Sequence, residues 1–66
     1  MTNNKLQNII ETLKNVQNEL LNIKGKDLRK IALQTKGLLP SEVEVLLENG
    51  ANEIGSTIYK LEKINN

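Results

Sequence analysis

The sequence predicts an all-α protein with three helices, or four if Gly50 divides the last one, built as an antiparallel α-hairpin with a short connecting helix. Three observations predict this class. Apolar residues recur at gaps of three and four from Leu6 to Ile23, which is the spacing of one helix face. A similar spacing returns between Val43 and Leu61. Glycines and one proline separate the two stretches. We expect residues 1–66 to form a single small domain.

The first helix is expected to start after a cap at Thr2 or Asn3 and to run to about Lys24. Ile10 and Leu21 are apolar residues beside the row that carries this spacing, and they widen the apolar surface of the helix. Leucine at a with β-branched residues at d favours tetramers in parallel coiled coils. The same spacing is typical of the core face of an intramolecular hairpin, and the two interpretations are compatible. The heptad positions a and d predict an oligomer interface made by Leu6, Ile9, Leu13, Val16, Leu20 and Ile23.

A second, short helix is expected from about Leu28 to Lys36. Gly25 has the character of a helix stop and is expected to end the first helix. Asp27 can cap the second helix, and Gly37 is expected to follow its end. The side chains expected to face inward are Leu28, Ile31, Ala32 and in part Leu33.

The last helix has the best-defined start, because Ser41 and Glu44 have the spacing of a capping box. Its inward residues are expected to include Val43, Leu46 and Leu47. The apolar phase is kept across Gly50, which favours one helix over 42–64; a break at Gly50 is the alternative. Ala51 and Gly55, one turn apart, predict a smooth strip where another backbone or a ligand can approach.

Self-association is expected to complete the core. For a chain this short, hydrophobic burial of roughly 90–100 kcal/mol is offset by an ordering cost of about 100 kcal/mol. Small domains overcome this balance with disulfides, metals or oligomerisation. The chain has no cysteine and no histidine, so disulfides and the usual zinc sites are excluded.

Catalysis is not expected. Without histidine and cysteine the chain cannot build the usual nucleophilic triads and dyads, and a two- or three-helix protein offers no deep cleft of its own. No cofactor and no metal are expected. The net charge of +1 implies no bulk acidic or basic partner. No membrane-spanning stretch or signal-peptide core is present, so the protein is predicted to be cytoplasmic.

A basic cluster marks the start of the second helix. Positive side chains beside free backbone N–H groups can hold a phosphate. The predicted ligand-binding residues are therefore Lys26, Arg29 and Lys30, with Tyr59 as the one residue able to stack on a base. The expected ligand is a nucleotide or other phosphate at a subunit boundary. The alternative is a solvated surface that pairs with the acidic residues of the last helix.

The stretch around Ala32, Gly37 and Val43 also resembles a helix-turn-helix motif. The resemblance covers about twenty residues and implies a DNA-binding regulator. Ala32 lies one residue too far from Gly37 for the motif. The recognition helix would carry Glu42 and Glu44, which phosphates repel. Nucleic acid is therefore not an expected partner, and a DNA-binding regulator is the third of the predicted functions.

The predicted function is that of a small non-catalytic interaction or regulatory protein, which self-associates and binds or inhibits another macromolecule. Leu21, Leu38 and Leu39 are expected to fill the core, or else to form a docking patch for that partner or part of the oligomer interface. Ten asparagines with many lysines and isoleucines are typical of an AT-rich genome. An anti-defence protein of a phage or mobile element would fit this size and composition. The alternative function is an oligomer that sequesters a nucleotide or other anionic ligand.

Overall fold

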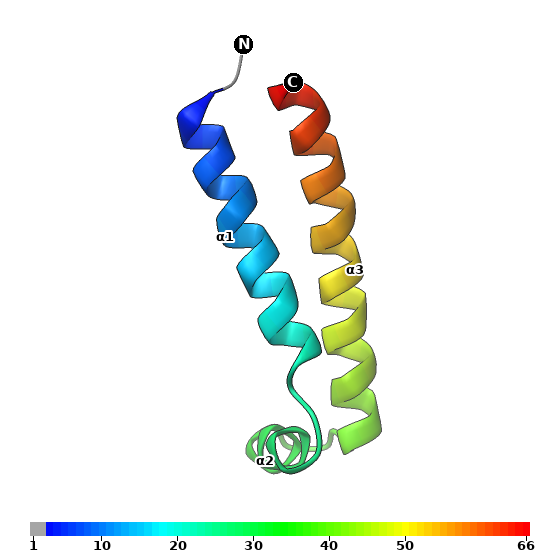
Figure 1. Cartoon of the computed structure of the whole chain (residues 1–66). Coiled ribbons are helices and arrows are strands. Elements are labelled where there is room, and N and C mark those ends of the chain that lie inside the picture. Colours follow the sequence, from blue (N-terminus) through cyan, green and yellow to red (C-terminus); the bar gives the residue numbers. More distant parts are fainter. Residues whose placement is uncertain (1–2) are drawn as a thin grey trace.

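The computed structural model describes residues 3–66, which form three helices (Figure 1). Helix α1 covers Asn4–Leu21, α2 covers Lys26–Gln34 and α3 covers Pro40–Asn65. Helices α1 and α3 run in opposite directions, so the start of α1 and the end of α3 lie at the same end of the molecule. The described residues contain no strand, which confirms the all-α prediction.

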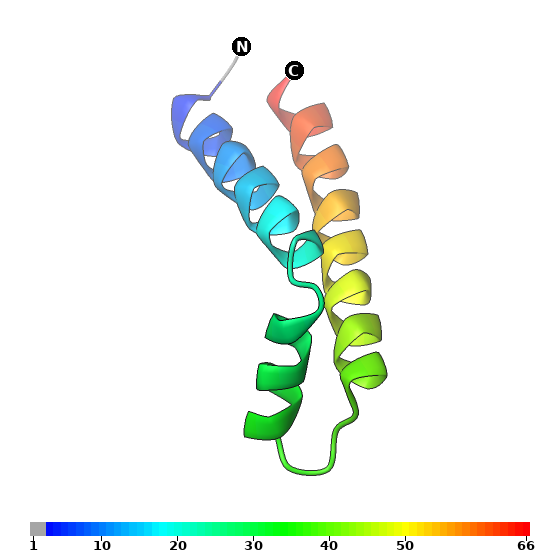
Figure 2. The ribbon, with the colours of Figure 1, turned by 60° about the horizontal axis from the view of Figure 1, so that its bottom comes forward.

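Both α1 and α2 pack on helix α3. Helix α1 lies along its C-terminal part and α2 lies beside its first turns (Figure 2). Figure 1 views α2 nearly end-on, so α2 turns steeply away from the plane of the α1–α3 hairpin. The result is an elongated molecule of 47 × 16 × 15 Å. This is the expected hairpin with a short connecting helix.

Asparagines close both ends of α1. The Asn3 side chain accepts a hydrogen bond from the Leu6 N–H at 3.0 Å, as an N-cap does. The alternative cap, Thr2, lies outside the described residues. The predicted end at Lys24 is wrong: the Asn22 N–H bonds to carbonyls of the preceding turn, and α1 ends at Leu21.

The predicted roles of Gly25 and Asp27 are also wrong. Gly25 occupies the N-cap position of α2 with φ of 56°, a left-handed conformation that glycine adopts without strain. Asp27 lies inside the first turn of α2 rather than at its cap. Helix α2 ends at Gln34, two residues before the predicted Lys36, because the Thr35 N–H closes the last turn.

Helix α3 begins at Pro40, a residue suited to the first helical position because its missing N–H has no partner there in any case. The predicted capping box at Ser41 and Glu44 is therefore wrong. Leu39 occupies the N-cap position, and the Glu42 carboxylate accepts a long hydrogen bond, 3.4 Å, from the Leu39 N–H. The helix continues through Gly50, which confirms the preference for one long helix over two.

The buried core is small. Ile10, between α1 and α3, is the one large side chain in the described chain that is fully buried. A second cluster joins α2 to α3 and consists of Leu28, Ala32 and Val43, with Ile23, Ile31, Leu38 and Leu47 packed around it.

Leu46 and Leu33, which were expected to face inward, are 58% and 85% exposed. Leu47 occupies the row of α3 that faces the core, and its neighbour Leu46 is turned by about 100° from it. Helix α1 ends before it reaches the level of Leu46. On α2, Leu33 is turned in the same way from its neighbour Ala32, which belongs to the buried cluster.

Candidate interaction surfaces

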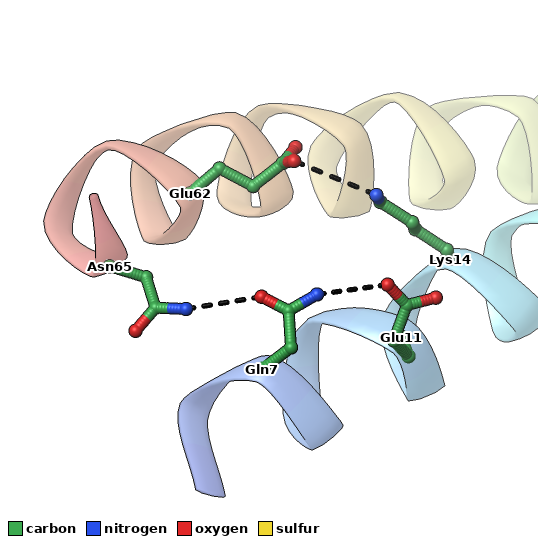
Figure 3. A network of polar contacts seen from close by, with 5 residues as sticks. All are labelled: Gln7, Glu11, Lys14, Glu62 and Asn65. Atoms are coloured by element: carbon green, nitrogen blue, oxygen red, sulfur yellow. Dashed lines mark hydrogen bonds and ion pairs between the residues drawn. The ribbon is translucent and has the colours of Figure 1, made fainter. Parts of the chain in front are cut away.

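One face of the α1–α3 hairpin is polar (Figure 3). Asn65 Nδ2 donates to Gln7 Oε1 at 3.1 Å, and Gln7 Nε2 donates to Glu11 Oε1 at 3.0 Å. Lys14 Nζ lies 3.6 Å from Glu62 Oε2. These contacts fix which side of α1 adjoins which side of α3.

The predicted smooth strip at Ala51 and Gly55 is filled by Gln17 of α1. Gln17 Nε2 donates a hydrogen bond of 3.0 Å to the Ala51 carbonyl. The same nitrogen lies 2.7 Å from the place where a Cβ on Gly55 would stand. The strip therefore serves the close approach of α1 within the chain, as the small residues predict for a neighbouring backbone.

The opposite side of the hairpin is apolar. Leu20 Cδ1 lies 3.9 Å from the position of a Cβ on Gly50, which places these two residues at this side. Residues three or four positions apart share a helix side and extend the row along each helix. We call this surface the apolar face; its members are Ile9, Leu13, Val16 and Leu20 of α1 with Gly50, Ile54, Leu61 and Ile64 of α3.

The predicted interface residues divide between the inside of the chain and its surface. Leu6, Leu13 and Leu20 are half-buried against α3, whereas Ile9 and Val16 are exposed. Ile23 lies beyond the end of α1 and packs on the α2 cluster. Helix α1 thus has two adjacent apolar rows. The row centred on Ile10 faces α3, and the row through Ile9 and Val16 faces outward.

The chain exposes more surface than its size requires. Its accessible surface is 5307 Å², whereas a compact folded monomer of 7.4 kDa exposes about 4,200 Å². The excess is about 1,100 Å², and a standard protein interface buries about 800 Å² on each partner. A two-helix layer explains the excess, because it has no second layer to cover its open side.

A second apolar surface lies at the turn between α2 and α3. Two shallow hollows adjoin there and share Leu38. Arg29 lines one hollow and Glu42 lines the other. We call this surface the end patch; its members are Leu33, Leu38, Leu39, Val45 and Leu46. Of the leucines predicted to dock a partner, Leu38 and Leu39 belong to it.

Leu21 lies elsewhere, at a cavity of about 270 Å³ where the three helices meet. Helix α1 ends and α2 begins at this junction, which leaves α3 uncovered between them. The lining residues are Leu20, Leu21, Ile23, Lys24, Gly25, Leu28, Glu44, Leu47 and Glu48.

The predicted ligand-binding residues occupy two separate places. Lys26, Arg29 and Lys30 are exposed on the first turns of α2. Tyr59 is exposed on α3, with Lys63 Nζ 4.6 Å from the centre of its ring. Leu47, which packs against α2, lies twelve residues before Tyr59, or about 18 Å along the helix. One chain therefore does not bring Tyr59 to the basic cluster, and a site combining them needs a second copy.

Within the described residues, no group of three or more histidine, cysteine, aspartate or glutamate side chains is placed to hold a metal ion. The part of the chain described also contains no helix with the length and apolarity needed to cross a membrane. Comparison of the chain with models of protein families, with curated proteins and with solved structures gave no match.

Proposed function

We propose that this protein is a non-catalytic helical interaction module that self-associates and binds another macromolecule. The observation that supports self-association is the accessible surface of 5307 Å², which exceeds that of a compact monomer of this mass by about 1,100 Å². The hairpin also has an apolar side that its own helices leave uncovered, and burial of that side against another surface would stabilise by about 25 cal/mol per Å².

The end patch supports the second half of the proposal. It lies beyond the end of α1. Leu38 is half-buried, and the other four members are exposed, with Leu39 and Val45 both more than half accessible. Contiguous exposed apolar residues rimmed by charge are typical of protein–protein contact sites. Arg29 and Glu42 supply such a rim. We assign this patch to the partner and the apolar face to self-association.

The experiment is a measurement of solution mass for the wild type and two variants. Val16→Glu places a charge on the apolar face and is expected to reduce the mass to that of one chain. Asn15→Glu, a similar change at an exposed position outside the apolar face, is expected to leave the mass unchanged. A wild type that stays at 7.4 kDa at every concentration would remove the self-association half of the proposal.

A further inference from the structure

We infer that the second copy packs on the apolar face turned end for end, so that α1 lies antiparallel to α1 and α3 antiparallel to α3 in a four-helix bundle. This inference rests on the proposed self-association and adds its geometry. Two identical faces can stack about a two-fold axis in two ways. When the axis runs across the helices, each helix packs on the same helix of the other copy, in the opposite direction. When the axis runs parallel to the helices, α1 of one copy packs on α3 of the other.

The contacts within one chain show which residues of α1 and α3 lie at the same height. Gln17 bonds to Ala51 and Gln7 bonds to Asn65. The residues midway between these pairs are Thr12 on α1 and Ile58 on α3, which therefore lie at the same height. A two-fold axis at this height passes close to Thr12 on one helix and Thr57 on the other.

The apolar residues are complementary about that axis. On α1, Ile9 and Val16 lie on either side of Thr12 and would meet each other across the copies. On α3, Ile54 and Leu61 are similarly placed about Thr57. Gly50 and Ile64 are each seven residues from Thr57, so the 72%-exposed Ile64 side chain would cover the glycine of the other copy.

The charges beside the apolar face are complementary in the same arrangement. Lys5 and Glu19, both exposed, flank the row of Ile9 and Val16 and are each seven residues from Thr12. Reversal of α1 therefore brings Lys5 of one copy to Glu19 of the other, twice in the dimer. The same holds on α3, where the exposed Glu53 and Lys60 lie on either side of Thr57. Reversal of α3 brings Glu53 of one copy near Lys60 of the other.

The other stacking places like charges together. With the axis along the helices, residues at equal height on α1 and α3 become neighbours. Glu19 lies near the height of Ala51 and would adjoin Glu53 of the other copy. Lys5, two residues before Gln7, would lie at the height of the end of α3 and would lose its acidic partner. Like charges in contact are destabilising, so the edge charges favour the end-for-end dimer.

A charge-reversal experiment separates these geometries. Lys5→Glu and Glu19→Lys each turn both inter-copy attractions into repulsions, and we expect each alone to raise the dimer Kd about tenfold. An equimolar mixture of the two variants restores both attractions in a heterodimer and is expected to return Kd to near the wild-type value. Each change also stabilises α1 itself, because Lys5→Glu puts an acid in the first turn and Glu19→Lys puts a base in the last. Lost association is then not due to lost folding.

Thiol cross-linking gives an independent test, because the chain has no cysteine of its own. Thr57→Cys places the thiol beside the two-fold axis and is expected to form a disulfide-linked dimer on mild oxidation. Asn52→Cys, exposed outside the apolar face, is the control and is expected to stay unlinked. If each charge reversal strengthens association, or Asn52→Cys links and Thr57→Cys does not, the end-for-end geometry is wrong although self-association stands. A wild-type protein that is monomeric overturns both.

Discussion

The Gln17 side chain occupies the space that any residue larger than glycine would need at position 55. Its amide nitrogen bonds to the Ala51 carbonyl at 3.0 Å and lies 2.7 Å from the position of a Cβ on Gly55. A polar side chain and a glycine together set how closely α1 approaches the middle of α3. Gly55 therefore compensates for its low helix propensity by allowing this contact.

This relationship predicts an unusual response to Gly55→Ala. Alanine improves helix propensity by about 1 kcal/mol, but its Cβ displaces Gln17 from a hydrogen bond worth about 1 kcal/mol. We expect Gly55→Ala alone to change the free energy of unfolding by less than about 0.5 kcal/mol. In a Gln17→Ala background the same change is expected to stabilise by about 1 kcal/mol. Urea unfolding of the four proteins gives the comparison, and equal effects in both backgrounds would contradict it.

Ile10→Ala is expected to be the most damaging single truncation on α1. Ile10 is fully buried, and removing such a side chain costs about 2–5 kcal/mol, which is comparable to the whole stability of a domain this small. Ile9→Ala is the matched control, because Ile9 is 52% exposed within the chain. Circular dichroism melting should show Ile10→Ala largely unfolded. Ile9→Ala should remain helical and show its loss as weaker self-association.

Asn65 is expected to hold the two ends of the chain together. It is 5% exposed, accepts a hydrogen bond from the Asn3 N–H at 2.8 Å and donates one to Gln7. Asn65→Ala leaves both partners unsatisfied at a part-buried site, so we expect a loss of about 1–3 kcal/mol. The exposed neighbour Asn66 offers the control Asn66→Ala. Amide hydrogen exchange should accelerate in the last turn of α3 for the first variant alone.

The anionic-ligand hypothesis makes a separate prediction about Arg29. If a nucleotide or phosphate binds at the start of α2, it should raise the melting temperature of the wild type, and Arg29→Glu should abolish that rise while leaving the solution mass unchanged. Lys36→Glu, the same charge change beyond the end of α2, is the control. A broad panel of nucleotides and inorganic phosphate that shifts no melting temperature would reject this hypothesis.

Apolar periodicity was sufficient to predict the helices and their order, because each helix buries one stripe and the stripe follows the sequence spacing. The unbroken phase from Val43 to Leu61 predicted one helix through Gly50, as observed. The ends of the helices were harder to predict. Ser41 and Asp27 are residue types that cap helices, yet Leu39 and Gly25 occupy those positions because each helix begins two residues earlier.

The division of α1 into two apolar rows could not be predicted from the spacing alone. A heptad seam and an intramolecular core face both place apolar residues at gaps of three and four, so the spacing does not say that Ile10, rather than Ile9, faces α3. The signal that could have found it is polar: Gln7, Lys14 and Gln17 share a side with Ile10 and meet partners on α3. The separation of Tyr59 from the basic cluster could be predicted only once the length of α3 was known.

The most direct test of the central claim is light scattering of the wild-type protein over a concentration series. We expect a mass that rises with concentration toward at least twice the 7.4 kDa of one chain, and that falls back when Val16 is replaced by glutamate. A folded species that remains at 7.4 kDa over the whole series would show that the apolar face stays open to solvent, and would contradict the account.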